Sequence, residues 1–253
     1  MGAVVLTERR RRGTAERLAA AAMEALLNAI DANDAVTGAH VRRVAASALV
    51  LAEAAGMDER QRRTVERVAL FHDIGKIHAA LFDILHDAAS LTAEERSAIA
   101  THPRRGSEVL EPLEAFYPEL CAGVLAHHER WDGTGYPMGL KGRRIPLAAR
   151  IVALADSFDA ITQSRRYSSG KSDDTGAERI LAGRGTQFDP ELVDLFLTPT
   201  VLAEIARARA TALKPRAKGA RRRNRKARPA PDVTFRWRNA VRGQPSPDPA
   251  EAR

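Results

Sequence analysis

Histidine and aspartate side chains recur along the chain at nearly regular intervals. Five of the seven histidines join two aspartates in an ordered series, namely His40, His72 with Asp73, His102, His127 with His128, and Asp156. Successive groups lie 25 to 32 residues apart, close to the length of one helix and a turn. Antiparallel packing would therefore return each group to the same level of a helical bundle, where bundle cores assemble metal sites.

The residue types in this series suit a metal-dependent hydrolase. Imidazole and carboxylate ligands together favour Mn, Fe, Co or Zn, whereas an all-oxygen site favours Mg or Ca. One carboxylate can bridge two ions about 3.5–4 Å apart, and such a pair activates water and holds a phosphoryl group in line. Adjacent histidine and aspartate cannot share one helix face, but at a fraying helix end both can reach inward. We therefore expect two ions, held by His72, Asp73, His102, His127, His128 and Asp156.

A single histidine on an apolar helix face is more often a hydrogen-bonded core residue than a metal ligand. This interpretation is kept for His78 and His86, which stand outside the series. Asp156 is different, because an isolated carboxylate on a buried helix costs several kcal/mol unless it is paired or metal-bound. Taken together, the series favours a metal site.

Three helices are predicted in the first third of the chain, over residues 15–30, 39–55 and 58–73. Their apolar residues recur at helical spacing, so one face of each helix packs on a core. Thr14 suits the start of the first helix, and Gly56 and Gly75 suit the ends of the second and the third. In the third, the spacing from Val65 to His72 points the histidine at the core.

The next helices carry the middle histidines. Thr92 and Glu95 form a capping-box pattern that opens a helix leading to His102, and Pro103 is expected to bend or end that helix. Pro118 suits the first turn of a further helix that continues to the two adjacent histidines. Each of these histidines therefore lies on or beside a predicted helix.

A loop of defined shape is predicted over residues 131–146, which are rich in glycine and contain two prolines. A long helix follows at 147–162; it is apolar on most sides and therefore buried, with Asp156 and Asp159 three residues apart on it. Smaller helices are expected over 177–183, 191–197 and 200–212. No alternating strand pattern occurs, so the predicted class is all-α.

Positive charge is concentrated at the C-terminal end. The chain carries a formal charge of +8, and residues 205–253 hold 15 Lys or Arg against 3 Asp or Glu, so the rest has a net charge of 8 − 12 = −4. Residues 213–253 are basic and rich in proline, and we expect a disordered tail. Its partner is open among nucleic acid, an anionic membrane and acidic proteins.

The expected compartment is the cytoplasm. Cys121 is the only cysteine, so no disulfide within the chain is possible and a reducing compartment fits. The N-terminus lacks the apolar segment of a signal peptide. No stretch approaches the roughly 18–20 apolar residues that a transmembrane helix needs.

Two motifs identify a family. Residues 72–76 read HDIGK and residues 127–137 read HHERWDGTGYP. Together they resemble the HD-GYP family of the HD phosphohydrolase superfamily, and the similarity runs over residues 28–198. The resemblance divides the chain into an N-terminal helical lead-in (1–27), the HD-GYP domain (28–198), a C-terminal helix (199–212) and the basic tail (213–253).

The resemblance implies a phosphodiesterase that hydrolyses cyclic di-GMP to linear pGpG, with GMP left open as a further product. It implies a helical HD-domain bundle with two metal ions, Fe or Mn first, with Ni, Co and Zn as alternatives. The ligands of one ion would be His40, His72, Asp73 and Asp156. Those of the other would be Asp73, His102, His127 and His128. Asp73 would bridge the ions, and a hydroxide between them would attack phosphorus.

Family positions that hold the substrate correspond to Lys76, Asp159 and Arg165. The competing interpretation of Lys76 is an exposed lysine at a helix end, without a role in substrate binding. A lip beside the active site corresponds to Gly133, Gly135, Tyr136 and Pro137. This lip is a candidate docking surface for GGDEF-type cyclases, and a purely structural turn is the competing interpretation.

The chain departs from the family pattern at three places. Val36 replaces a glutamate that supports a third metal in some members, so two ions are predicted. Residues 166–168 replace a Pro-Tyr-basic sequence, which removes one expected substrate contact. The segment 78–90 is also altered. A hydrolase of another nucleotide or cyclic dinucleotide, or a non-catalytic dinucleotide sensor that docks a cyclase, therefore stays open as an alternative.

Overall fold

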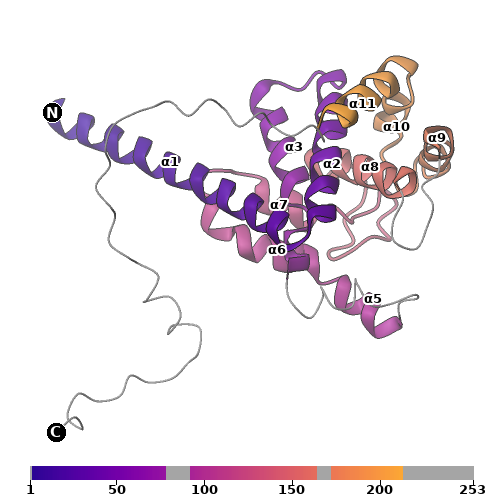
Figure 1. Ribbon diagram of the computed structural model, residues 1–253, viewed down its shortest axis with the longest axis horizontal. Helices are drawn as coiled ribbons and strands as arrows, with labels where there is room; N and C mark the ends of the chain where they lie inside the picture. Colours follow the sequence, from indigo (N-terminus) through magenta and orange to yellow (C-terminus); the bar gives the residue numbers. More distant parts are fainter. Residues whose placement is uncertain (1, 78–91, 164–171, 213–253) are drawn as a thin grey trace, which may run out of the picture. The chain divides into compact units, whose positions relative to one another are not determined.

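The computed structural model describes three ranges of the chain, residues 2–77, 92–163 and 172–212 (Figure 1). Every regular element in these ranges is a helix, and the only β contact there is an isolated bridge between Arg184 and Phe188. The predicted all-α class is therefore confirmed. None of the described helices is both long and apolar enough to cross a membrane.

Several predictions fall outside these ranges: the substrate role of Arg165, the altered segments 78–90 and 166–168, the interpretation of His78 and His86 as core residues, and the disordered tail from residue 213. They stay predictions from the sequence.

The helices occur in the following order. The first half of the described fold holds α1 (Gly2–Asn33), α2 (Ala35–Ala54), α3 (Glu59–Phe71), the 3-10 helix η1 (Ile74–Ile77), α5 (Ala93–Ile99), α6 (His102–Leu110) and the 3-10 helix η2 (Glu111–Leu113). The second half holds α7 (Leu120–Leu125), the 3-10 helix η3 (Gly142–Arg144), α8 (Leu147–Thr162), α9 (Asp173–Ala182), α10 (Pro190–Phe196) and α11 (Pro199–Ala212).

Two predictions about helix bounds are confirmed: the second helix ends before Gly56, and the buried helix spans residues 147–162. Gly56 follows α2 with a φ of +72°, the left-handed conformation that glycine adopts most readily. α8 has the predicted bounds. The prediction that Thr14 opens the first helix is wrong, because α1 begins at residue 2. The arginine-rich run before Thr14 has high helix propensity and extends the helix in the N-terminal direction.

The ends of the helices near the histidines differ from the predicted ones. α3 stops at Phe71, and His72 is its C-cap. The capping box of Thr92 and Glu95 is confirmed, but α5 ends at Ile99 and Pro103 lies in the first turn of the separate helix α6. Proline suits a first turn because its missing N–H has no helical partner there. α7 stops at Leu125, so both adjacent histidines follow the helix.

α2 is the central helix of the described fold. It contacts α1, α3, α8, α10 and α11, and its buried face carries apolar side chains such as Val41, Val44 and Leu51. α6 contacts α7 and η1 in a second group of helices. α3 contacts α2, α7 and α8 and so connects the two groups. The C-terminal end of α3, with His72 and Asp73, therefore lies where both groups meet.

Gly75 has a packing role and not the helix-ending role predicted for it. It lies in η1 without a positive φ, and a Cβ atom there would meet the backbone oxygen of His102 and, at 2.7 Å, the backbone nitrogen of Gly106. The absence of a side chain lets η1 approach the first turn of α6. This approach brings the end of α3 close to His102.

We predict that Gly75→Ala destabilises the protein by about 1–3 kcal/mol or more, because backbone atoms of α6 cannot move away as a flexible side chain would. Urea unfolding followed by circular dichroism measures the change. Gly13→Ala is the matched control: a Cβ there meets only the end of Arg17, at 3.8 Å, and removing a glycine from α1 should add about 0.5–1 kcal/mol. Equal midpoints for Gly75→Ala and wild type would contradict this account of η1.

Candidate metal centre

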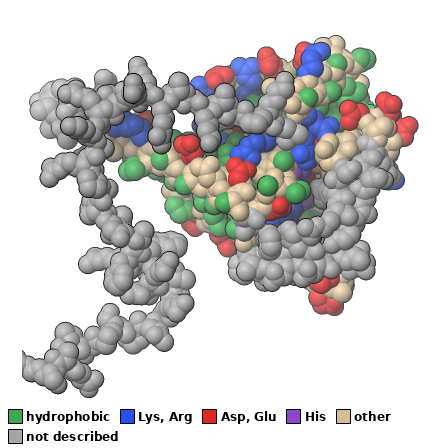
Figure 2. All heavy atoms as spheres, viewed as in Figure 1, with side chains coloured by type: hydrophobic (Ala, Val, Ile, Leu, Met, Phe, Trp, Pro, Cys, Tyr) green, Lys and Arg blue, Asp and Glu red, His purple; other side chains and the backbone are tan. Residues whose placement is uncertain are grey.

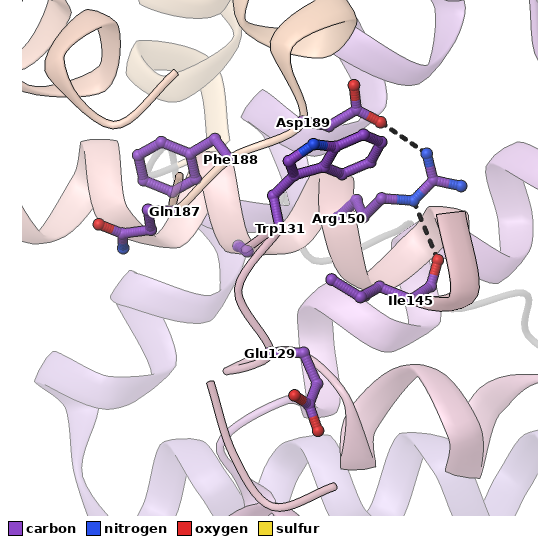
Figure 3. Close-up of a pocket in the computed structure, with 8 residues that line it drawn as sticks. Glu129, Trp131, Ile145, Arg150, Gln187, Phe188 and Asp189 are labelled. Carbon is purple, nitrogen blue, oxygen red and sulfur yellow. Dashed lines mark hydrogen bonds and ion pairs between the residues drawn. The ribbon is translucent and has the colours of Figure 1, made fainter. Parts of the chain in front are cut away.

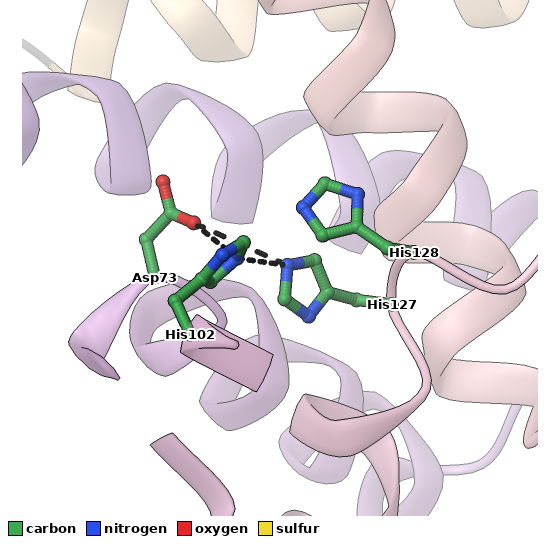
Figure 4. A group of neighbouring side chains, drawn as sticks. All are labelled: Asp73, His102, His127 and His128. Atoms are coloured by element: carbon green, nitrogen blue, oxygen red, sulfur yellow. Dashed lines mark hydrogen bonds and ion pairs between the residues drawn. The ribbon is translucent and has the colours of Figure 1, made fainter. Parts of the chain in front are cut away.

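Seven side chains of the predicted series converge in the described fold. Their ligand atoms form two groups, and within each group these atoms lie within 4.8 Å of one another. The first group contains Asp73, His102, His127 and His128 (Figure 4). The second contains His40, His72 and Asp156. The helices α2, α6 and α8 and the segments directly after α3 and α7 each contribute at least one member.

The first group surrounds one oxygen of Asp73. Nε2 of His102 lies 3.3 Å from Oδ1 of Asp73, and Nε2 of His127 lies 4.0 Å from it. The two Nε2 atoms are 3.2 Å apart. The His128 ring packs beside both histidines, with ring centroids 4.9 Å from His102 and 4.1 Å from His127.

The second group faces the other oxygen of the same carboxylate. Oδ2 of Asp73 lies 3.5 Å from Nε2 of His72 and 4.0 Å from Nε2 of His40. Oδ1 of Asp156 lies 3.2 Å from Nε2 of His40 and 3.8 Å from Nε2 of His72. Asp73 therefore stands between the two groups, with one oxygen toward each.

Backbone carbonyls fix three of the imidazoles. Nδ1 of His72 donates to the carbonyl oxygen of Ala69, that of His102 to Ile99 and that of His127 to Val124, at 2.6–2.7 Å. Since a carbonyl can only accept, each Nδ1 must carry the proton. In the neutral form of each ring, Nε2 is therefore the unprotonated nitrogen, and it faces the centre, as metal-binding histidines require.

These nitrogens fit bound cations. The Nε2 lone pairs of His102 and His127 face each other at 3.2 Å, where they repel unless a positive charge lies between them. Two nitrogen ligands of one ion, each about 2.1 Å from it, can have this separation. Nε2 of His72 is buried and has no hydrogen-bond partner, which is costly for a polar atom without another ligand.

The electrostatics of the centre hold most of its histidines neutral. Burial, together with neighbouring histidines, lowers the pKa of His127, and burial likewise lowers the pKa of His72 despite nearby carboxylates. Burial and His102 lower the pKa of His128 to about 4. Burial also acts against protonation of His40, but hydrogen bonds to Asp156 and Asp159 outweigh it and raise its pKa to about 9.

The two carboxylates of the centre stay ionised. Burial favours their neutral forms, but the Lys76 ammonium group and the nearby histidines outweigh it and hold the pKa of Asp73 well below its usual range. For Asp156, the hydrogen bond from His40 has the same effect. Lys76 lies in η1, and its Nζ is 2.7 and 2.8 Å from the two oxygens of Asp73. The substrate-binding lysine predicted from the sequence is thus beside the centre.

The predicted lip folds back over the two adjacent histidines. The Tyr136 ring stacks on the His128 ring, with centroids 5.0 Å apart and planes at 25°, and the backbone N–H of Tyr136 donates to the carbonyl of His128. The peptide bond from Tyr136 to Pro137 is cis, and Gly133 has a φ of +87°. A Cβ atom at Gly135 would collide with the backbone of Glu129 and Arg130. The lip residues therefore shape one wall of the centre.

Glu129 holds the chain that follows the lip. Its side chain is buried, and its two oxygens accept hydrogen bonds from the backbone N–H groups of Met138 at 2.6 Å and Leu140 at 2.9 Å. The sequence reasoning included this glutamate in the motif but gave it no role. Its position directly after His127 and His128, two predicted ligands, was the one sign in the sequence of a role near the centre.

A small cavity beneath the lip is lined by Glu129, Trp131 and Arg150, with four further labelled side chains around it (Figure 3). Arg150 donates to Oδ2 of Asp189 at 2.6 Å and to the carbonyl of Ile145 at 3.0 Å, and its guanidinium lies 5.8 Å from the centre of the Trp131 ring. This network ties the loop to α8 and to the start of α10. This network has a structural role.

Asp159 occupies a different place from the predicted substrate contact. Its side chain is 1% exposed, and its oxygens accept hydrogen bonds from His40, Arg43 and Arg209. No free oxygen is thus presented to a substrate, because every lone pair region has a donor. Sequence reasoning missed both arginines. Arg43 is three residues from His40 on α2, which was the available signal, whereas nothing in the sequence marks Arg209.

Comparison with known proteins gives one family and several enzyme relatives. A profile described as an HD domain matches residues 24–192. The chain is 40% identical over 191 residues to the cyclic di-GMP phosphodiesterase response regulator RpfG of Xanthomonas campestris pv. campestris, an alignment that covers 75% of this chain and 48% of that protein. It is 38% identical over 173 residues to the 3'3'-cGAMP-specific phosphodiesterase 2 of Vibrio cholerae, which covers 68% of this chain and 33% of the relative. The chain spans about half the length of these relatives or less.

Two solved structures share the fold. A cyclic GMP-AMP specific phosphodiesterase of Vibrio cholerae, V-cGAP3, matches with a TM-score of 0.55 at 21% identity, over 76% of this chain and 52% of that one. Bd1817 of Bdellovibrio bacteriovorus, described as an HDG"Y"P protein, matches with a TM-score of 0.55 at 19% identity, over 76% of this chain and 64% of that one. At these identities the likeness concerns the helical bundle alone.

Replacing Glu129 should loosen the lip. We expect Glu129→Ala to speed amide hydrogen exchange at Met138 and Leu140 by about tenfold or more, because each loses a hydrogen bond to a buried charged acceptor, worth about 1.5–3 kcal/mol. Exchange followed by mass spectrometry measures it. Glu191→Ala removes a 75% exposed carboxylate that pairs with Arg143 at the surface and should leave both amides unchanged. Equal exchange in the two variants would show that Glu129 does not hold the lip.

Proposed function

Because the chain belongs to the HD domain family, we propose that it is a metal-dependent phosphodiesterase that hydrolyses a cyclic dinucleotide, with cyclic di-GMP as the first candidate. The carboxylate of Asp73 between two groups of imidazoles carries this proposal, since it is the arrangement that a two-metal hydrolase needs. Relatives named as cyclic di-GMP and 3'3'-cGAMP phosphodiesterases support the substrate class. The activity is proposed for this chain by similarity over part of their length.

Each group would hold one ion. His40, His72, Asp156 and Oδ2 of Asp73 would bind one. His102, His127, His128 and Oδ1 of Asp73 would bind the other. When bound, such ions act as Lewis acids and lower the pKa of a coordinated water toward neutrality. The mixed nitrogen and oxygen donors favour Fe or Mn, with Ni, Co and Zn as alternatives.

A third ion is not proposed. Val36, at the position where some members carry a glutamate ligand, lies in the first turn of α2 and is 73% exposed. It offers no ligand atom.

The chain's own residues position the substrate and its charge. Asp73 and Asp156 would hold the ions, and Lys76 would turn from Asp73 to donate to a phosphate oxygen and stabilise the charge that develops there. Burial, with Asp73 and Asp156 nearby, raises the pKa of Tyr136 to about 12, so its hydroxyl keeps its proton and is a hydrogen-bond donor at the mouth of the site. Asp159 would act on His40 and not on the substrate.

The reaction consumes one water for each bond cut. The water oxygen bonds to phosphorus, and the bond from phosphorus to the ribose 3′ oxygen breaks. One proton ends on the leaving 3′ oxygen and the other passes to solvent. A first cut would give linear pGpG, and a second would give GMP.

The relatives named for 3'3'-cGAMP favour a second substrate, because the chain is nearly as similar to one of them as to the relative named for cyclic di-GMP. Arg165, which the sequence predicts to contact the substrate, lies outside the described residues, so its part in choosing between the two substrates stays a prediction. Docking of GGDEF-type cyclases on the lip, binding of nucleic acid or anionic membrane by the tail, and the domain boundaries stay predictions from the sequence.

Incubation of metal-loaded protein with a panel of cyclic dinucleotides, separated by chromatography, tests the proposal. We expect hydrolysis of cyclic di-GMP, of 3'3'-cGAMP or of both. Asp73→Asn should lower turnover by about 10³-fold or more, because it removes several kcal/mol of electrostatic stabilisation at both ions. Asp194→Asn, which changes a 58% exposed carboxylate paired with Arg184, is the matched control and should keep wild-type activity. Binding of a dinucleotide without any turnover would favour the sensor alternative.

A further inference from the structure

A buried arginine on the last described helix reaches the neighbourhood of the metal centre. Arg209 lies on α11 and is 17 residues past residue 192, where the segment matched by the HD domain profile ends. Its side chain is 7% exposed. One terminal nitrogen donates to Oγ1 of Thr162 at 2.7 Å and to Oδ1 of Asp159 at 3.1 Å. A buried guanidinium is costly unless it is paired. Asp159 and the more exposed Asp173, whose Oδ1 lies 3.6 Å from the other terminal nitrogen, balance its charge.

Arg209 shares its acceptor, Asp159, with Arg43 of α2. Asp159 accepts two parallel hydrogen bonds from Arg43, from Nε to Oδ1 at 2.8 Å and from a terminal nitrogen to Oδ2 at 2.9 Å. Such a bidentate pair fixes the plane of the carboxylate. Arg209 adds a third donor from α11, which packs against α2, so two cations from different helices hold one buried carboxylate.

The held carboxylate in turn orients an imidazole. Oδ2 of Asp159 lies 2.8 Å from Nδ1 of His40, and an ionised carboxylate can only accept, so Nδ1 carries the proton. Nε2 of His40 then faces Oδ1 of Asp156 at 3.2 Å. A carboxylate behind a metal-binding histidine sets both its tautomer and its ring orientation.

His40 differs here from three other imidazoles of the centre. Those of His72, His102 and His127 are oriented by backbone carbonyls three residues earlier, which no side-chain substitution removes. The orientation of His40 depends on side chains from α8, α2 and α11. A change in these side chains should therefore affect one half of the centre and spare the other.

We propose that Arg209, together with Arg43 and Asp159, is a positioning residue for His40, so that α11 sets the affinity of the ion held by His40, His72 and Asp156. The inference rests on the proposed metal centre. In this inference α11, a helix outside the matched segment, affects the binding of one of the two ions and not of the other. The other ion, held by His102, His127 and His128, does not depend on α11.

Titration of the metal-free protein with Mn²⁺ by calorimetry, with bound metal counted by mass spectrometry, tests this. Wild type should bind two ions. In Arg209→Met, which keeps the length of the side chain and removes its donors, one dissociation constant should rise by about 10–100-fold and the other should not change. Arg207→Met is the matched control on the same helix, because Arg207 is 71% exposed and pairs with Glu204 of the same helix. Its titration should match wild type.

A double-mutant cycle separates positioning from a general structural effect. Once His40→Ala has removed the imidazole, Arg209→Met should have no further effect on Mn²⁺ affinity, because residues that act through one another are not additive. Arg209→Lys, which keeps the charge and one donor group, should fall between Arg209→Met and wild type and serves as the second variant if Arg209→Met does not fold.

Three results would overturn the inference: equal weakening of both ions, unchanged titration in Arg209→Met and Arg209→Lys, or an undiminished effect of Arg209→Met in the His40→Ala background. Failure of the proposed function is a separate result. Wild type that binds two ions but hydrolyses no dinucleotide would leave the role of Arg209 intact. Wild type that binds no Mn²⁺ would refute the metal centre and this inference together.

Discussion

Unprotonated imidazole nitrogens that face one another in a buried space repel unless a cation lies among them, and this constraint organises the described fold. The hydrogen bonds from Nδ1 of His72, His102 and His127 to backbone carbonyls leave each Nε2 as a lone pair directed at the centre. Asp73 adds negative charge between them, and its burial would be costly without compensating cations. Lys76 supplies part of that compensation, and bound metal ions would supply the rest.

The bundle meets this constraint with helix ends. His72 and Asp73 follow the last turn of α3, His102 begins α6, and the adjacent histidine pair follows α7. At a helix end the chain changes direction, so neighbouring residues can both reach inward, which they cannot do within a helix. The close approach of η1 to α6 at Gly75 then brings two of these ends together. The long helices α2 and α8 add His40 and Asp156 from the side.

Most of the described fold was predictable from local signals, and most of the centre from residue types at regular spacing. The bounds of α8 and the capping box at Thr92 follow from chemistry within a few residues. The role predicted for Gly75 was wrong because the glycine is required by a close contact with His102, which is 27 residues away in the sequence. The pairing of Asp159 with Arg209 could not be foreseen, since Arg209 lies on a helix 50 residues later. Long-range pairs of this kind leave no periodic pattern in a sequence.

The central claim is that one carboxylate joins two ions in this centre. Crystals of the protein grown with Mn²⁺ and measured at the manganese absorption edge test it most directly. The account predicts two anomalous peaks about 3.5–4 Å apart, one beside His40, His72 and Asp156 and one beside His102, His127 and His128, with an oxygen of Asp73 on each. A single peak, or two peaks of which one lies away from Asp73, would contradict it.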